Sequence, residues 1–174
     1  MTARSNWQWL LVTALVVIFD QYTKRLIMAT FELFDRLPVL PFFDIVRLHN
    51  TGAAFSFLAN ASGWQNWFFT IVAVTISAII LWWLFRQPAG RVVMPLGLAL
   101  VLGGAIGNLI DRLQHGYVVD FILVYYDRWA FPAFNIADSA ITVGVALLLI
   151  DGFFLERNRA RQSTDTSLNA SNGP

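Results

Sequence analysis

The sequence contains no cysteine, which excludes disulfide bonds, thiolate metal sites and a cysteine nucleophile. It has only two histidines, His49 and His115, which are too few and too scattered for a histidine-based zinc site. Charged residues make up only 13% of the chain, whereas soluble domains usually contain about a quarter. The net charge of +1 gives no indication of a nucleic-acid partner.

Apolar residues, by contrast, are abundant and make up 57% of the 174 residues. A chain of this size cannot bury so much apolar surface in a core of its own, so lipid is the expected solvent. Four apolar runs reach or approach the roughly 20 residues that a helix needs to cross a bilayer. They cover residues 7–29, 64–85, 92–110 and 134–150. The sequence therefore predicts a membrane protein with four transmembrane helices.

The connectors between these runs differ in length and character. Residues 87–90 have the composition of a tight turn. Residues 31–63 and 113–132 are longer, contain β-forming stretches and lie on the same side of the membrane, so we expect a small sheet there. Residues 1–161 are expected to form a single domain, followed by a disordered polar tail over residues 162–174.

The distribution of basic residues favours one orientation of the bundle. Arginines flank the short turn between the second and third runs, at Arg86 and Arg91, and three more follow the fourth run at residues 157–161. Few acidic residues accompany them, and cytoplasmic loops are enriched in lysine and arginine. We therefore expect both termini in the cytoplasm.

Polar side chains gather where antiparallel spans must meet. The ends of the first and third runs and the start of the fourth lie at one face of the membrane. These places carry Asp20, Lys24, Asn108, Asp111, Arg112, Asn135 and Asp138, and Asp120 lies in the connector between the last two runs. Ionisable residues within spans are costly, face the bundle interior and are candidates for function.

Small residues predict how the third and fourth runs pack. Gly103 with Gly107, and Ala140 with Gly144, are pairs spaced four residues apart. Such pairs allow helix backbones to approach closely. We expect the third and fourth spans to pack tightly and to bring their polar residues together.

Several of these polar residues also have a purely structural interpretation. Asp20 and Lys24 lie four residues apart, so they share a helix face and can form an ion pair. Asp111 and Arg112 can form an interfacial ion pair. Asp120 is harder to explain in this way, because it stands among apolar residues where an acid gains nothing from packing.

Five stretches of the sequence form a further pattern. They are DQYTK (20–24), NTGAAFS (50–56), GGAIGNLIDR (103–112), VVDF (118–121) and FNIADS (134–139). In this order, on a chain with four apolar runs, they resemble the lipoprotein signal peptidase (signal peptidase II) family of bacterial membrane-embedded aspartic peptidases. The resemblance covers about residues 8–155.

The resemblance implies an all-α membrane fold of four transmembrane helices with a small extracytoplasmic β-cradle and a short amphipathic helix. It implies a bacterial inner-membrane enzyme with its site near the outer face, expected to act as a monomer among membrane lipids. Its substrates would be prolipoproteins that carry diacylglycerol on a cysteine, and the cut would fall just before that cysteine.

The resemblance also assigns expected roles to residues of this chain. Asp120 and Asp138 would be the catalytic pair. The residues expected to line the site or hold substrate are Asn50, Gly52, Asn108, Arg112 and Asn135, and those expected to support it are Asp20, Lys24 and Asp111.

The chemistry of two neighbouring carboxyl groups suits peptide hydrolysis. Two such groups cannot both ionise cheaply, so they share one proton. The ionised group activates water as a base and the protonated group acts as an acid. Asp138 opens a helix, where its anion is favoured, so we expect it to be the base and Asp120 the acid. A bell-shaped pH profile and no metal or organic cofactor are expected.

Three other functions remain open from the residues alone. One is a membrane serine peptidase that uses Ser56 with Lys24. The second is a small transporter or proton-coupled channel that uses the same acidic residues. The third is a non-catalytic scaffold for partner helices.

Overall fold

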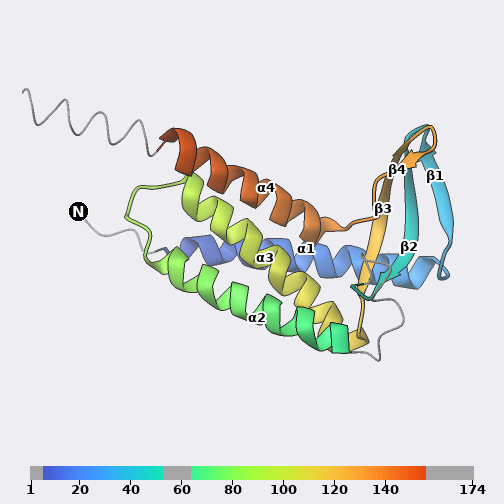
Figure 1. The fold of residues 1–174 in the computed structure, drawn as a ribbon, viewed down its shortest axis with the longest axis horizontal. Coiled ribbons are helices and arrows are strands. Elements are labelled where there is room, and N and C mark those ends of the chain that lie inside the picture. The colour runs from blue at the N-terminus through green and yellow to red at the C-terminus, as the bar shows by residue number, and fades with distance from the viewer. Residues whose placement is uncertain (1–5, 53–63, 156–174) are drawn as a thin grey trace, which may run out of the picture.

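The computed structural model describes residues 6–52 and 64–155. Four long helices form a bundle, and a small sheet covers one end of it (Figure 1). The helices are α1 (Gln8–Thr30), α2 (Trp64–Phe85), α3 (Val93–His115) and α4 (Ile136–Ile150), and α4 continues into the π-helical segment η2 (Asp151–Leu155). The strands are β1 (Arg36–Leu40), β2 (Phe43–Asn50), β3 (Val118–Tyr126) and β4 (Trp129–Ala130).

Within the described part of the chain, three helical stretches are long and apolar enough to cross a membrane. They are Asn66–Phe85, Val93–His115 and Ile136–Phe153. Helix α1 also has 23 residues, but Asp20, Lys24 and Arg25 make it less apolar. Asp20 and Lys24 are buried in the bundle, whereas Leu11 and Leu15 are exposed on the outside of α1. That α1 is a fourth span therefore remains a prediction.

Helix α3 lies at the centre of the bundle and contacts α1, α2 and α4. Of its most apolar stretch, 67% is buried, against 17% for each of the other two candidate spans. The outer faces of α2 and α4 carry exposed apolar side chains, as expected for helices surrounded by lipid. The structure thus has a protein-packed central helix and peripheral helices that face the membrane.

The close approach of α3 and α4 confirms the expected tight packing. Gly144 of α4 takes part as predicted, but on α3 the close contacts are at Gly97 and Gly104 rather than Gly103. A Cβ added at Gly97 would lie 2.9 Å from the Gly144 carbonyl oxygen of α4. A Cβ added at Gly104 would lie 2.3 Å from the Ala137 carbonyl oxygen, also on α4. Gly103 instead faces Val16 of α1. The period of 3.6 residues per turn places neighbouring glycines on different helix faces, so the small residues of α3 serve two interfaces.

The sheet has the strand order β1-β2-β3-β4, and all its pairings are antiparallel. It forms the small sheet expected from the two long connectors. A bridge between Ile122 and Phe134 joins β3 to the segment that leads into α4. Among residues 6–52 and 64–155 there is no separate short amphipathic helix, and the predicted tail over 162–174 lies outside the described residues.

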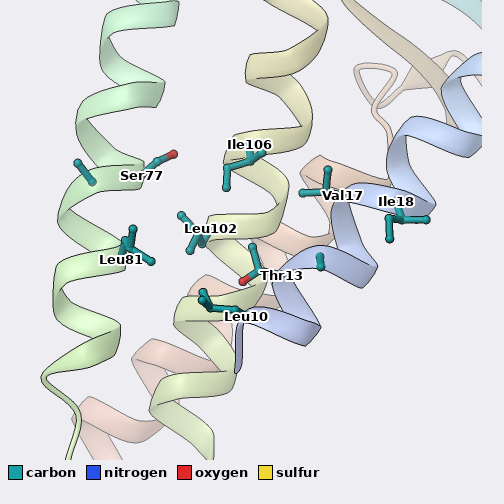
Figure 2. A pocket seen from close by; sticks show the side chains of 10 residues that line it. Leu10, Thr13, Val17, Ile18, Ser77, Leu81, Leu102 and Ile106 are labelled. Carbon is teal, nitrogen blue, oxygen red and sulfur yellow. The ribbon is translucent and has the colours of Figure 1, made fainter. Parts of the chain in front are cut away.

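An apolar groove lies between α1 and α2, with α3 at its base (Figure 2). Its volume is about 520 Å³, and its lining includes Leu10 of α1, Leu81 of α2 and Leu102 of α3. None of the acidic residues of the bundle lines it. This groove is therefore separate from the polar residues described next.

Candidate active site

Strand β3 places Asp120 at the end of the bundle. Its register partner is Leu48, and Asn50 pairs with Val118 two residues along the strand. The Asp120 side chain is buried, and both of its oxygens accept hydrogen bonds. Asn50 Nδ2 donates to Oδ2 at 3.0 Å, and Asn135 Nδ2 donates to Oδ1 at 2.7 Å.

The start of α4 brings Asp138 to the same place. Asn135 is the N-cap of this helix, and its Oδ1 accepts a hydrogen bond from the Asp138 backbone N–H at 2.9 Å. Asp138 Oδ2 accepts in return from the Asn135 backbone N–H at 3.3 Å. This reciprocal pair is a capping box. Because Asn135 also donates to Asp120, one residue links both carboxyl groups.

Asn108 of α3 holds the other oxygen of Asp138. Its Nδ2 donates to Asp138 Oδ1 at 2.8 Å, while its Oδ1 accepts from Lys24 Nζ at 3.0 Å and from Asn135 Nδ2 at 3.3 Å. An ammonium group can only donate, so Lys24 fixes which end of the Asn108 amide faces it. The amide N–H₂ of Asn108 is thereby directed at Asp138.

A buried charge cluster lies beneath the two candidate catalytic acids. Lys24 Nζ lies 2.8 Å from Asp20 Oδ2 and 3.1 Å from Asp111 Oδ2. Asp20 Oδ1 accepts from the Ala137 backbone N–H at 2.9 Å, and Asp111 Oδ2 accepts from the Val119 backbone N–H at 3.0 Å. The cluster therefore ties α1, α3, α4 and β3 together next to Asp120 and Asp138.

Gln21 belongs to this cluster, although no role was predicted for it from the sequence. Its Nε2 donates to Asp111 Oδ1 at 2.8 Å and to the Gly107 carbonyl oxygen at 3.1 Å. The DQYTK stretch contains this residue, but a neutral amide beside an ion pair carries little signal of its own. Its contacts depend on how α1 is rotated about its axis relative to α3, which the sequence does not specify.

Arg112 and Gly52 lie at the edge of the site. The Arg112 guanidinium lies over the Phe69 ring, 5.4 Å from its centre, and interacts electrostatically with Asp120 and Asp138. Gly52 has a φ of +85°, which favours glycine. Its backbone N–H donates to Asn50 Oδ1 at 2.9 Å, and this contact leaves Asn50 Nδ2 facing Asp120.

The surroundings of Asp120 raise its pKa well above the ordinary value of a carboxyl group. Burial is the largest cause that raises the pKa of Asp120, and the negative charge of Asp138 is the second. The hydrogen bonds from Asn50 and Asn135 lower the pKa, but the result is still about 7. A carboxyl group with this pKa can donate a proton near neutral pH while its partner accepts one.

All ten residues singled out from the sequence thus lie in one connected region at the sheet end of the bundle. Within residues 6–52 and 64–155, no group of three or more acidic or histidine side chains has the arrangement of a metal site. Ser56, the nucleophile of the alternative serine mechanism, lies outside the described residues. The geometry offers two acids linked through Asn135, three amides that donate to them and a nearby guanidinium.

Comparisons with known proteins agree on a single family. A family model described as Signal peptidase (SPase) II matches residues 12–154. The lipoprotein signal peptidase of Acinetobacter baumannii is 54% identical over 158 residues, which is 91% of this chain and 90% of that protein. The lipoprotein signal peptidase of Shewanella woodyi is 56% identical over 146 residues, which is 84% of this chain and 82% of that protein.

Solved structures show the same fold. A bacterial membrane enzyme determined by the in meso method at 1.9 Å has a TM-score of 0.76 and 36% identity, covering 84% of this chain and 93% of that chain. A second one, at 2.3 Å, has a TM-score of 0.72 and 38% identity, covering 82% and 85%. Together with the motifs, these matches show that the chain belongs to the signal peptidase II family and is a membrane aspartic peptidase.

Proposed function

We propose that this enzyme removes the signal peptide from prolipoproteins that carry diacylglycerol, cutting just before the lipidated cysteine, and that Asp120 and Asp138 activate the attacking water. The observation that carries the proposal is the position of Asn135, which donates to Asp120 and forms the capping box with Asp138. The names of the relatives support the class of substrate.

In the proposed mechanism the two acids have different tasks. Asp138 is the base that accepts a proton from water, and it lies in the first turn of α4, where the helix dipole favours an anion. Asp120, with its pKa of about 7, is the acid that polarises the scissile carbonyl and then protonates the leaving amine. Asn50, Asn108 and Asn135 hold the two carboxyl groups in position through their amide donors.

Two clefts beside the acids suggest how the substrate lies. An apolar groove of about 420 Å³ runs between α2 and α4, and Asn108 and Arg112 are its polar lining residues. We assign the membrane-embedded part of the substrate to this groove. A second cleft of about 280 Å³ is lined by Asn50, Asp120 and Pro132, and we assign the chain beyond the cut to it.

The proposed topology follows from the same arrangement. The site and the sheet lie at the end of the bundle opposite the α2–α3 turn (Figure 1). With α1 as a fourth span and both termini in the cytoplasm, the site would lie near the outer face of the bacterial inner membrane. The enzyme would then act as a monomer on substrates that reach it from the lipid.

The contacts of Lys24 argue against the serine mechanism. A serine–lysine pair needs a lysine whose amine can accept a proton. Lys24 Nζ instead contacts the carboxylates of Asp20 and Asp111 and the amide oxygen of Asn108. These acceptors occupy all three of its donor positions and leave none toward a nucleophile.

Cleavage of a lipidated and an unlipidated precursor in vesicles tests the proposal. We expect the wild-type enzyme to cut only the lipidated form, and Asp120→Asn and Asp138→Asn each to abolish cleavage while the protein still inserts and stays folded. Ser56→Ala is the matched comparison and should retain cleavage. Activity in both Asp→Asn variants would overturn the assignment of the acids, and equal cleavage of both precursors would overturn the assignment of the substrate.

A further inference from the structure

Phe69, on the second turn of α2, contacts three parts of the site at once. Its ring lies beneath the Arg112 guanidinium, at 5.4 Å from centroid to Cζ. Its edge also fills the space beside Gly52, where an added Cβ would lie 2.3 Å from Phe69 Cε2. The same side chain lines the groove between α2 and α4.

The Phe69 ring is one of the few close partners of the Arg112 guanidinium. None of the salt bridges found at Lys24 and Arg36 includes Arg112, which interacts with Asp120 and Asp138 only at longer range, within the described part of the chain. Among the residues that the structure describes, the Arg112 side chain donates a long hydrogen bond, of 3.5 Å, to the Asn108 carbonyl oxygen. An aromatic face attracts a guanidinium group electrostatically, and more strongly where water is excluded.

Phe69 also couples Arg112 to the end of β2. Gly52 donates its N–H to Asn50, which in turn donates to Asp120. Because the ring occupies the space beside Gly52, Phe69 limits how far this backbone can move toward α2. One aromatic side chain thus lies between the guanidinium at the groove and the backbone that orients Asn50.

We propose that Phe69 is a positioning residue for substrate binding, in that it holds Arg112 where the guanidinium meets a substrate carbonyl oxygen at the entrance to the apolar groove. The inference rests on the proposed function of the site. It predicts an effect on binding rather than on the proton transfers, since the observed partners of Phe69 are Arg112 and the backbone at Gly52.

The test compares Phe69→Leu, which keeps an apolar side chain but removes the ring, with Phe69→Tyr, which keeps the ring. We expect Phe69→Leu to raise KM for the lipidated precursor about three- to tenfold, the range of a partly desolvated cation–π contact. The kcat and the pH profile of Phe69→Leu should change little, and Phe69→Tyr should have a KM close to that of the wild type. Phe85→Leu, the same change at the far end of α2 where the ring packs on Trp7, is the matched control and should not alter KM.

A double-mutant cycle separates positioning from simple packing. If the ring acts through Arg112, Arg112→Lys should raise KM much less in the Phe69→Leu background than in the wild type. If the two substitutions instead multiply KM independently, the proposal is overturned. It is also overturned if Phe69→Leu leaves KM unchanged or lowers only kcat or thermal stability. Binding of the same precursor to these variants, measured without cleavage, tests Phe69 even if the proposed reaction fails.

Discussion

At the scale of single residues, three asparagine amides are oriented by the same principle. In Asn50, Asn108 and Asn135 the amide oxygen accepts from a donor that cannot accept in return: the Gly52 N–H, the Lys24 ammonium and the Asp138 N–H, respectively. Each amide N–H₂ is therefore turned toward a carboxylate. The three amides act as fixed donors, which require no reorganisation when charge develops at the acids.

Asn135 provides the most direct test of this arrangement. In Asn135→Ser the hydroxyl still caps α4, because serine is a good N-cap residue, but the donor to Asp120 Oδ1 is lost. We expect kcat to fall about 10- to 100-fold, the range for a hydrogen bond to a charged group, with a smaller loss of thermal stability than in Asn135→Ala, which also lacks the cap. Asn135→Ala should lose both activity and stability, and full activity in the serine variant would contradict the role given to the amide.

The pH dependence of cleavage follows from the raised pKa of Asp120. If Asp120 must be protonated, activity is present below its pKa of about 7 and is lost as pH rises through this value. The hydrogen bond from Asn50 lowers that pKa, so Asn50→Ala should raise it. We expect the alkaline limb of the pH–rate profile to move to higher pH in this variant, whatever its maximal rate. A limb that stays in place or moves to lower pH would assign it to another group.

At the scale of elements, the interface between α3 and α4 sets the position of the second acid. A Cβ at Gly104 would lie 2.3 Å from the Ala137 carbonyl oxygen, one residue before Asp138. The obstacle is backbone rather than a flexible side chain, so it cannot move without shifting the first turn of α4. The glycines of α3 thus control both helix packing and the geometry of the site.

Gly104→Ala is therefore expected to lower both stability and activity. Overpacking of this kind costs about 1–3 kcal/mol, and the displaced turn should weaken the contact between Asn108 and Asp138. The melting temperature in detergent and kcat provide the two readouts. Gly152→Ala is the matched control, since a Cβ there has no neighbour within 4 Å. A wild-type melting temperature and kcat in Gly104→Ala would contradict this prediction and show that α4 can shift without loss.

At the scale of the whole molecule, the sequence predicted three of the candidate spans and the meeting place of the polar residues, whereas the first span remains a prediction. The uncharged run over 64–85 is α2, because no charged residue interrupts the apolar stretch between its two ends. Helix α3 continues beyond the predicted end at 110 to His115, because Asp111 and Arg112 face protein partners rather than lipid. The charges that seemed to end the apolar run are thus part of the helix.

Contacts that depend on helix rotation could not be predicted in the same way. Which helix Gly103 faces, or that Gln21 reaches Asp111, depends on how α1 and α4 are turned against α3. The position of Phe69 between Arg112 and Gly52 has no signature in a run of apolar residues. Spacing within one helix predicts which residues share a face but not which neighbour that face meets.

The buried charge cluster joins three helices, so its disruption should affect the molecule as a whole. Lys24 is 1% exposed and lies between the carboxylates of Asp20 and Asp111. Lys24→Met leaves two buried carboxylates without a cation, which typically costs about 3–5 kcal/mol, so we expect a large fall in melting temperature and loss of cleavage.

Adding Asp20→Asn to the Lys24→Met variant removes one of the two uncompensated charges. The asparagine Oδ1 can still accept the Ala137 N–H, so the tie between α1 and α4 survives. We therefore expect the double variant to be more stable than Lys24→Met alone, yet still impaired in cleavage, because no ammonium then orients Asn108 toward Asp138. Equal melting temperatures for the single and double variants would show that uncompensated charge is not what destabilises the bundle. Recovery of cleavage together with stability would show that Asn108 keeps its orientation without Lys24.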